Sequence, residues 1–506
     1  MSKAISSYEL TLRARSRNQT LTTWLYGELR SAILQGRLAP ETRLPASRDF
    51  AIQHGLSRGT VVSVFERLQA EGYISSHVGS GTRVNRLAVK AGEARPGTTP
   101  PAFIRRVAAD YKRPKAWVDI VASEGVRPFQ MRDPAIAEFP TKLWGSIAAR
   151  RARNFSSWLR TQDDGRGYRP LREAITHYLA VSRGVRCSAE QIVMVSGTQQ
   201  ALDLLARLLL EKDEPVWMED PGYFGAEIAF SSVGAEIIPV PVDEQGLNVD
   251  AGLRLCPDAR GVYVTPAHQF PLGTTMSLER RMALLKWASR AGAFVIEDDY
   301  DSEYRFEGLP IPALQSLDRN SNVILVGSFA KLLTPTLRIG YMVLPASLVD
   351  LFRAFRYRTD FRSLSLDQAV LCDFIEDGHL GRHLRRMRNL YSTRLAALMD
   401  GGQQYLSGLV KISDVRAGLY TVGFLENGMG SRQAEKAAAM RGVDVVALDR
   451  YSLKCPDPRG VLLGFAAFDE VSIRRSLRQL AAALDQKHAI SPVALPGGRA
   501  SSKKSN

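Results

Sequence analysis

Residues 322–331 read Asn-Val-Ile-Leu-Val-Gly-Ser-Phe-Ala-Lys, and this stretch decides the fold. Its unbroken apolar run predicts a strand buried on both faces of a parallel sheet. It brings Lys331 to the carboxyl end of that strand, where a lysine can be desolvated and form a Schiff base with a carbonyl compound. A lone lysine after a strand is usually structural, so its interpretation depends on other segments.

Two further segments supply groups that such a lysine needs. Residues 293–301 read Ala-Phe-Val-Ile-Glu-Asp-Asp-Tyr-Asp, a strand that ends in acids, which are costly there unless they face a cation or a site. Residues 192–199 read Ile-Val-Met-Val-Ser-Gly-Thr-Gln and run from a strand into a helix, where free N–H groups suit a phosphate. Alone, these segments also fit a solvated loop and a capped helix. With Ser328 and Arg338 as phosphate ligands, the three together predict a cofactor site.

Strand-like and helical segments alternate from about residue 126 to 485, which predicts a mostly parallel α/β sheet. Residues 87–125 include Ala-Arg-Pro-Gly-Thr-Thr-Pro-Pro and are predicted to be a linker. Residues 486–506 are predicted to be a disordered tail. The clearest strand segments are 191–195, 215–218, 261–265, 293–297 and 322–327.

The N-terminal residues 20–86 form a separate, basic module in this interpretation. Residues 1–90 hold 13 Lys and Arg against 6 Asp and Glu, in a chain of net charge +15, which favours a polyanionic partner. A short helix, a turn at His54-Gly-Leu-Ser57 and a helix that Ser57 can cap follow the helix-turn-helix pattern. Glycines at 79 and 81 indicate a β-wing.

The rest of the composition narrows the class of protein. The chain has 506 residues, 45% of them hydrophobic, and its apolar runs are interrupted by charges well before the roughly 20 residues of a membrane span. The N-terminus lacks a signal-peptide pattern. The four scattered cysteines form no CxxC pair, so neither a disulfide framework nor a metal site is expected. We therefore expect a cytoplasmic protein without a membrane partner.

The module at 20–86 resembles the winged helix of GntR-type regulators. The resemblance rests on Leu44-Pro-Ala-Ser-Arg48, Leu56-Ser-Arg58, Thr60-Val61, Glu71-Gly-Tyr73 and Gly79-Ser-Gly-Thr82. It implies binding of duplex DNA, with contacts from Arg48, Ser57, Arg58, Thr60 and the wing around Gly81. Gly59 departs from the pattern and loosens the start of the recognition helix.

The remainder resembles fold-type I enzymes that use pyridoxal 5'-phosphate (PLP), and the whole chain resembles the MocR-type (GabR-like) branch of GntR regulators. The implied fold is an aminotransferase-like α/β domain at 126–485 with a smaller C-terminal α+β subdomain. The motifs that carry the resemblance are Gly165-Arg-Gly-Tyr168-Arg-Pro-Leu-Arg172, Ser196-Gly-Thr-Gln-Gln200, Glu219-Asp-Pro-Gly-Tyr223, Val264-Thr-Pro-Ala-His-Gln-Phe-Pro271, Glu297-Asp-Asp-Tyr300-Asp-Ser-Glu303, Gly327-Ser-Phe-Ala-Lys331 and Arg385-Arg-Met-Arg388-Asn-Leu-Tyr391.

The resemblance implies a role for each matching residue. Lys331 resembles the lysine that binds PLP covalently, Asp298 the partner of the pyridine nitrogen, and Tyr300 the phenol near the 3'-oxygen. His268 or Gln269 would be the polar group near that oxygen. Gly197, Thr198, Ser328 and Arg338 resemble the phosphate ligands, and Tyr223 would lie close to the ring. Arg459 resembles the arginine that binds a substrate carboxylate, with Arg450 as the competing residue.

The chain departs from the family pattern at Ala330, Ala267, Leu272 and Glu227, and these changes could weaken cofactor affinity or alter effector choice. Three hypotheses remain. The first is a homodimeric transcription regulator that senses a small amino compound through PLP on Lys331. The second is a PLP-dependent aminotransferase with an accessory DNA-binding module. The third is a DNA-binding protein whose large domain serves only dimerisation. Likeness to aminotransferases does not establish turnover.

Overall fold

The computed structural model describes residues 10, 12–15, 19–77, 81–86, 127–131, 133–153, 164–308, 310–359, 365–454 and 459–485. The chain divides into two compact units, Met1–Trp117 and Val118–Asn506. The predicted linker at 87–125 and the predicted tail at 486–506 lie outside the described residues.

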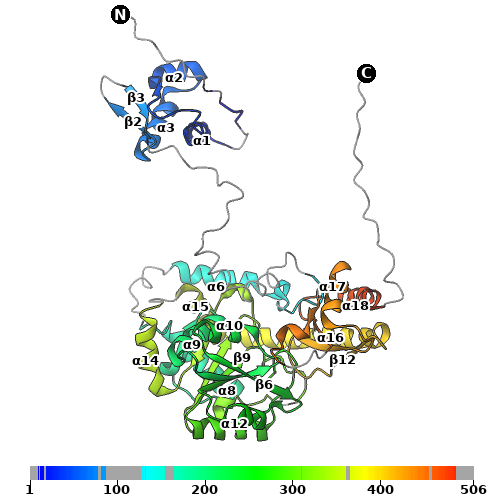
Figure 1. Ribbon diagram of the computed structural model, residues 1–506. Coiled ribbons are helices and arrows are strands. Elements are labelled where there is room, and N and C mark those ends of the chain that lie inside the picture. The colour runs from blue at the N-terminus through cyan, green and yellow to red at the C-terminus, as the bar shows by residue number, and fades with distance from the viewer. Residues whose placement is uncertain are drawn as a thin grey trace, which may run out of the picture. The chain divides into compact units, whose positions relative to one another are not determined.

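The first unit is a winged helix, which confirms the predicted fold of this module (Figure 1). Its three strands form an antiparallel sheet in the order β1-β3-β2, in which Ile74 pairs with Val84 and His77 with Gly81. Apolar side chains at helical spacing, among them Leu25, Val64 and Phe65, close its core. Its elements are α1 (Leu21–Leu34), β1 (Arg43–Leu44), α2 (Ser47–His54), α3 (Arg58–Ala70), β2 (Ile74–His77) and β3 (Gly81–Val84).

The second unit is built on an eight-stranded sheet in the order β4-β11-β10-β9-β8-β5-β6-β7. Strands β10, β9, β8, β5 and β6 run parallel, whereas β11 is antiparallel to both β10 and β4. This arrangement confirms the mostly parallel α/β sheet. The strands are β4 (Ile192–Val195), β5 (Pro215–Asp220), β6 (Glu236–Asp243), β7 (Gly246–Leu247), β8 (Gly261–Val264), β9 (Phe294–Asp299), β10 (Val323–Ser328) and β11 (Gly340–Val343).

Helices cover both faces of this sheet, because successive side chains of a strand point to opposite faces. Ile296 of β9 packs into one core cluster with α9 and α10, whereas the adjacent Val295 packs into another with α11 and α12. The helices are α6 (Thr141–Arg153), α8 (Arg169–Arg183), α9 (Thr198–Leu209), α10 (Phe224–Ser232), α11 (Val249–Leu255), α12 (Leu278–Ala291), α13 (Leu314–Leu317), α14 (Ala346–Arg356) and α15 (Ser365–Glu376), with short 3-10 turns η2 (Ile136–Glu138), η3 (Ala189–Gln191) and η4 (Pro335–Leu337).

A smaller α+β subdomain follows, as the resemblance implied. Its four antiparallel strands lie in the order β12-β13-β15-β14, and α16, α17 and α18 gather beside them (Figure 1). Its elements are α16 (His379–Tyr405), β12 (Val410–Ile412), β13 (Tyr420–Leu425), α17 (Ser431–Met440), β14 (Val446–Ala447), η5 (Leu448–Tyr451), β15 (Gly460–Gly464) and α18 (Glu470–Leu484).

Candidate functional site

The candidate site lies at the carboxyl edge of the large sheet. Val326 of β10 is paired with Asp298 of β9, and Val264 of β8 is paired with Glu297, so these three parallel strands end side by side. Loops that leave parallel strands on the same edge meet there. The register therefore gathers Asp298, the loop holding His268 and the turn holding Lys331.

Lys331 stands three residues beyond β10 and is half-buried. Its Nζ donates a hydrogen bond to the carbonyl oxygen of Met131, at 3.1 Å. Met131 belongs to the first stretch of the second unit that the structure describes, residues 127–131. The candidate reactive amine thus contacts a segment 200 residues earlier in the chain.

Asp298 is 4% exposed, and one of its two carboxylate oxygens accepts a hydrogen bond. The hydroxyl of Tyr263 donates to Oδ2 at 2.7 Å, whereas Oδ1 is buried without a hydrogen-bond partner among the residues that the structure describes. Burial raises the pKa of Asp298 to about 7, and the bond from Tyr263 lowers it. A buried acceptor without a partner is costly, so Oδ1 fits a cationic N–H donor such as a protonated pyridine nitrogen.

The predicted phosphate ligands come from three adjacent strands. Ser328 of β10 pairs with Gly340 of β11, and Gly340 pairs with Val195 at the end of β4. A Cβ on Gly340 would lie 3.0 Å from the Cα of Gly197, so only glycine permits this approach. Gly197, with φ of +97°, is the N-cap residue just before α9 and offers no side chain to the first-turn N–H groups of that helix. These N–H groups therefore suit an anion.

Thr198 and Arg338 are the other two predicted phosphate ligands, and each lies close to Gly197 or Gly340 in the sequence. Thr198 is the first residue of α9, and Arg338 ends the turn η4, two residues before Gly340. Arg338 is exposed and holds a φ of +51°, a conformation that residues with a Cβ rarely adopt. Strain of this kind gathers at ligand sites.

Tyr300 and His268 lie within one polar cluster. The hydroxyl of Tyr300 is 3.1 Å from Nδ1 of His268 and 3.0 Å from the hydroxyl of Tyr420 on β13. Nδ1 of His268 is also 3.0 Å from each carboxylate oxygen of Asp301. A Cβ on Gly418 would reach 2.0 Å from Cε1 of this ring, so the imidazole is tightly held. This cluster joins the large sheet to the C-terminal subdomain.

Gln269 faces a different set of partners from His268. Its amide nitrogen donates to Glu219 at 3.2 Å and to the carbonyl of Pro221 at 3.0 Å, while its oxygen accepts from the backbone N–H of Leu272. Gln269 therefore fixes its own loop, and His268 is the one of the two that contacts Tyr300. Burial raises the pKa of Glu219 to about 7.

Tyr223 is the N-cap residue just before α10, and its ring lies 6.4 Å from that of Tyr263 and 5.8 Å from that of Phe270. Burial raises its pKa, and the charge of Asp298 raises it further. Tyr223 thus lies close to the predicted partner of the ring nitrogen.

Arg459 and Arg450, the two candidates for the effector's carboxylate, both come from the C-terminal subdomain. Tyr420, which contacts Tyr300, pairs with Gly464 at one end of β15, whereas Arg459 precedes Gly460 at the other end. Arg459 is exposed there. The competing Arg450 is held by three hydrogen bonds from its guanidinium to Glu435, at 2.8, 3.0 and 2.5 Å.

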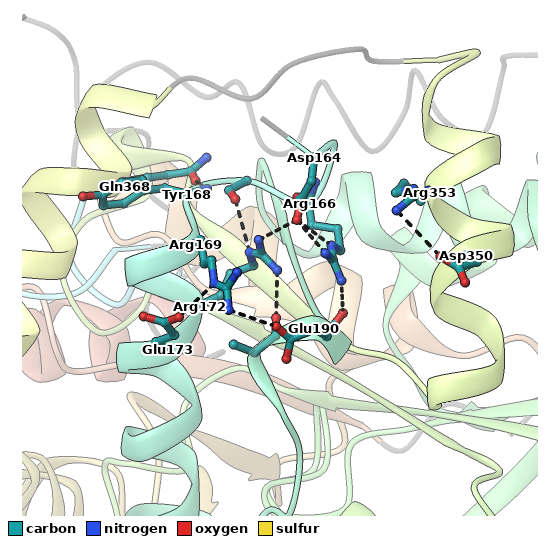
Figure 2. Close-up of polar contacts among 12 residues, drawn as sticks. Asp164, Arg166, Tyr168, Arg169, Arg172, Glu173, Glu190, Asp350, Arg353 and Gln368 are labelled. Carbon is teal, nitrogen blue, oxygen red and sulfur yellow. Dashed lines mark hydrogen bonds and ion pairs between the residues drawn. The ribbon is translucent and has the colours of Figure 1, made fainter. Parts of the chain in front are cut away.

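Arg172 is held in its motif by a network of hydrogen bonds and an ion pair. Figure 2 shows Arg166 and Arg172 both turned toward Asp164. Arg172 is 1% exposed, bonds Asp164 at 2.9 Å and donates to the carbonyl oxygens of Gly167 and Ala189. Since the carbonyl of Arg166 accepts from the N–H of Met194, this clamp holds the loop against β4.

The predicted DNA-contacting residues lie on α2, at the start of α3 and on the wing. Ser57 caps α3: its Oγ accepts from the backbone N–H of Thr60 at 3.1 Å and lies 2.8 Å from the hydroxyl of Thr60. Arg48 and Arg58 are exposed and make no ion pair among the described residues. Gly81, with φ of +81°, begins β3, and the guanidinium of Arg43 lies 2.8 Å from where its Cβ would be.

Three groups at the site were missed in the sequence. Tyr263 carries a hydroxyl inside an otherwise apolar strand, a signal that could have marked it as the partner of a buried acid. Tyr420 and the carbonyl of Met131 gave no local signal, because the tertiary fold alone brings them to Tyr300 and Lys331. Within the described ranges, no group of three or more His, Cys, Asp or Glu side chains is placed so that it could hold a metal ion. No helix in those ranges is long and apolar enough to span a bilayer.

Comparison with known proteins gives two family matches. Residues 21–84 match the bacterial regulatory proteins of the gntR family, and residues 146–460 match aminotransferase class I and II. The chain is 39% identical over 465 residues to the probable rhizopine catabolism regulatory protein MocR of Rhizobium meliloti, covering 91% of this chain and 92% of that protein. It is 30% identical to the pyridoxine biosynthesis transcriptional regulator PdxR of Corynebacterium glutamicum, covering 92% and 96%.

Solved structures resemble the second unit. LysN, an α-aminoadipate aminotransferase from Thermus thermophilus in complex with N-(5'-phosphopyridoxyl)-L-leucine, superposes with a TM-score of 0.69 at 26% identity. The match covers 77% of this chain and all of that one. A kynurenine aminotransferase from Pyrococcus horikoshii matches with a TM-score of 0.67 at 25% identity, covering 77% and 95%.

Proposed function

Because this chain belongs to the MocR-type branch of the GntR family of transcription regulators, we propose that it senses an amino-group-containing effector through PLP bound to Lys331. The winged helix is its DNA-binding part, and the aminotransferase-like unit is its sensor. The observation that carries the proposal is the unpartnered Oδ1 of Asp298, at the same sheet edge as Lys331.

The residues at this edge fit PLP. When bound, PLP supplies an aldehyde carbon that bonds one primary amine and can exchange it for another. Asp298 would accept a hydrogen bond from the ring nitrogen, and its negative charge would keep that nitrogen protonated. Ser328, Arg338 and the first-turn N–H groups of α9 would hold the phosphate. The solved relative with a bound phosphopyridoxyl group supports this assignment.

The remaining residues orient the group and exclude water. Tyr263 donates a hydrogen bond to Oδ2 of Asp298, so that Oδ1 would be available to the ring nitrogen. Tyr300 supplies a hydroxyl beside the reacting end, positioned by His268 and Tyr420. For the effector's carboxylate we keep Arg459 as the assigned residue, with Arg450, which is paired with Glu435, as the competing one.

The first test is covalent attachment. Purified protein supplied with PLP should show a visible absorption band, and borohydride followed by mass mapping should label Lys331. Lys331→Ala should lose the band, whereas Lys286→Ala, which removes an exposed lysine on α12, should keep it. A band that survives in Lys331→Ala, or a label on another lysine, would contradict the assignment.

The second test is the response. DNA binding to the protein's own promoter should change when the PLP-loaded protein is titrated with a panel of amino acids and amines. A coupling free energy of about 1–3 kcal/mol corresponds to a several-fold to hundred-fold change in DNA affinity. Lys331→Ala should bind DNA but not respond. If the variant responds as the wild type does, the PLP site is not the sensor.

The alternative is an aminotransferase with an accessory DNA-binding module. The solved relatives that match the second unit are aminotransferases, which favours retention of that chemistry. Multiple-turnover formation of an oxo acid from an amino acid, independent of DNA, would favour the enzyme over the regulator.

A further inference from the structure

A short segment near the start of the second unit packs against both Lys331 and the C-terminal subdomain. We call residues 127–131 the strap. The carbonyl oxygen of Phe129 accepts from the N–H of Gly464 at 2.8 Å, and that of Pro128 accepts from the N–H of Asp444 at 2.9 Å. Phe129 is 1% exposed and has a φ of +69°. The strap is therefore docked by its backbone and anchored by one buried ring.

The strap lies so close to Gly464 of β15 that there is no space for a side chain at that position. A Cβ on Gly464 would lie 2.3 Å from the carbonyl oxygen of Gln130 and 3.0 Å from the Cα of Met131. Contacts this short do not occur for real Cβ atoms, so only glycine at 464 lets the strap lie against β15. The other edge of β15 at this position is paired with Tyr420 of the candidate site.

The last residue of the strap, Met131, contacts the reactive lysine, Lys331. The carbonyl oxygen of Met131 accepts from Nζ of Lys331 at 3.1 Å. In the sequence, the strap directly follows residues 87–126, the stretch that joins the winged helix to the second unit. One short segment thus connects the lysine amine to the path of chain that leads to the DNA-binding unit.

We propose that the strap reports the chemical state of Lys331: the primary amine holds Met131, and the amine bonded to the cofactor releases it. This inference rests on the proposed function and adds the route of regulation. When Nζ is joined to the cofactor's aldehyde carbon, it is drawn to the cofactor and no longer offers an N–H to Met131. When Nζ is a primary amine, it again has donors for that carbonyl.

The exchange that switches the lysine is balanced. The carbon–nitrogen double bond to Nζ breaks as the double bond to the incoming primary amine forms. The two hydrogens of the incoming nitrogen end on Nζ, and nothing is oxidised or reduced. An effector therefore creates the donor that binds the strap, and the strap's two arrangements differ in one hydrogen bond at Met131. Such unequal contacts are what an effector needs to shift a conformational equilibrium.

The direct test compares three forms of the wild-type protein. PLP and borohydride-reduced PLP both keep Nζ bonded to the cofactor, whereas pyridoxamine 5'-phosphate (PMP) carries its own amine and leaves Nζ as a primary amine. Hydrogen exchange should be slower at the amides of Asp444 and Gly464 in the PMP form, since these amides donate to the strap. The reduced form should resemble the PLP form. Equal exchange in the PLP and PMP forms would overturn the inference.

A second test uses a variant that disrupts the contact between the strap and β15 and keeps Lys331. Gly464→Ala should bind PLP with a visible band like that of the wild type, and its strap amide partners should exchange rapidly in every form. Gly430→Ala is the matched control, because Gly430 lies in the same subdomain and a Cβ there would meet nothing within 4 Å. Thermal unfolding of both variants checks that the subdomain remains folded.

The outcomes separate this inference from the proposed function. Wild type and Gly430→Ala should show a several-fold difference in DNA affinity between their PLP and PMP forms. Gly464→Ala should show a difference below about twofold. If Gly464→Ala keeps the full difference, or if the wild type shows none, the strap is not the route. If PLP does not attach to the wild type at all, the proposed function fails first.

Discussion

At the scale of single residues, the site depends on how the two oxygens of Asp298 are divided. Tyr263 donates to Oδ2, and Oδ1 has no hydrogen-bond partner within the described part of the chain. Burial without a cation makes this carboxylate expensive to ionise, which raises its pKa to about 7. The protein thus carries a destabilised group whose cost a protonated ring nitrogen would relieve.

Asp298→Asn should therefore stabilise the PLP-free protein in a pH-dependent way. The pKa of Asp298 rises from about 4 in the unfolded chain to about 7 in the folded one, so the folded state holds an extra proton between these values. Wild-type stability falls as pH rises through this window, by at most about 1.4 kcal/mol per pH unit. Calorimetric melting should show the advantage of the asparagine variant growing from about pH 5 to pH 7 and then levelling off.

The same substitution should abolish the benefit of PLP. Asparagine cannot supply the negative charge that keeps the ring nitrogen protonated, so adding PLP should raise the melting temperature of the wild type much more than that of Asp298→Asn. A pH-independent difference between the two PLP-free proteins would contradict the pKa assignment.

Tyr263→Phe should weaken PLP binding without removing any group that touches it. A hydrogen bond to a charged group contributes about 1.5–3 kcal/mol, so the dissociation constant for PLP should rise roughly tenfold or more. The pH at which PLP binds should also move upward, because the pKa of Asp298 loses its lowering contribution. Spectrophotometric titration with PLP across a pH series measures both effects.

A matched control for this variant exists in the same fold. The hydroxyl of Tyr178 donates to Glu303 at 2.6 Å, and burial raises the pKa of Glu303 to about 7. Tyr178→Phe thus removes the same kind of bond from another buried acid. It should change stability but leave the pH dependence of PLP binding as in the wild type. An identical shift in both variants would mean that Tyr263 acts only through general packing.

At the scale of elements, the start of α3 combines a structural and a recognition role that mutation can separate. Ser57→Ala removes the cap and should cost about 0.5–2 kcal/mol of stability in the winged helix. Arg58→Ala, at an exposed position, should leave stability within about 0.5 kcal/mol. It should nevertheless lower affinity for the protein's own promoter by about 1–3 kcal/mol if it reads a base.

Thermal melting and DNA titration at one fixed salt concentration distinguish the two variants. If Arg58 contacts only phosphate, affinity should fall by a similar amount on every DNA sequence. Unchanged promoter affinity in Arg58→Ala would count against its place in the recognition surface.

The elements themselves could largely be predicted from sequence, because local patterns specify them. The run at 322–327 became β10, the acid-ended run became β9, and Ser57 became the cap of α3. The carboxyl-edge position of Asp298 and Lys331 followed from strand direction alone. Arg459 could not be judged this way, since its distance from Tyr300 depends on the antiparallel register of β13 and β15. Tyr420 and Met131 depend on tertiary contacts with no local sequence pattern.

At the scale of the whole molecule, we expect a homodimer. Closed two-fold symmetry is the commonest oligomer, and the large apolar side chains of Leu351 and Tyr357 are 62% and 54% exposed at α14. Sedimentation at micromolar concentration should give the mass of two chains. Leu351→Lys should shift the equilibrium toward the monomer, whereas Val181→Lys, at an equally apolar exposed site on α8, serves as the comparison. A wild-type monomer would refute the expectation.

The closed core of the winged helix has an evolutionary consequence. The side chains of that core all come from residues 10–84, so the unit needs no partner to bury its apolar surface. A gene segment encoding it can therefore be recombined with another receptor without unfolding either product. We expect a chimera that joins this segment to an unrelated dimeric receptor to keep the operator preference of the present protein and to acquire the inducer of the new one.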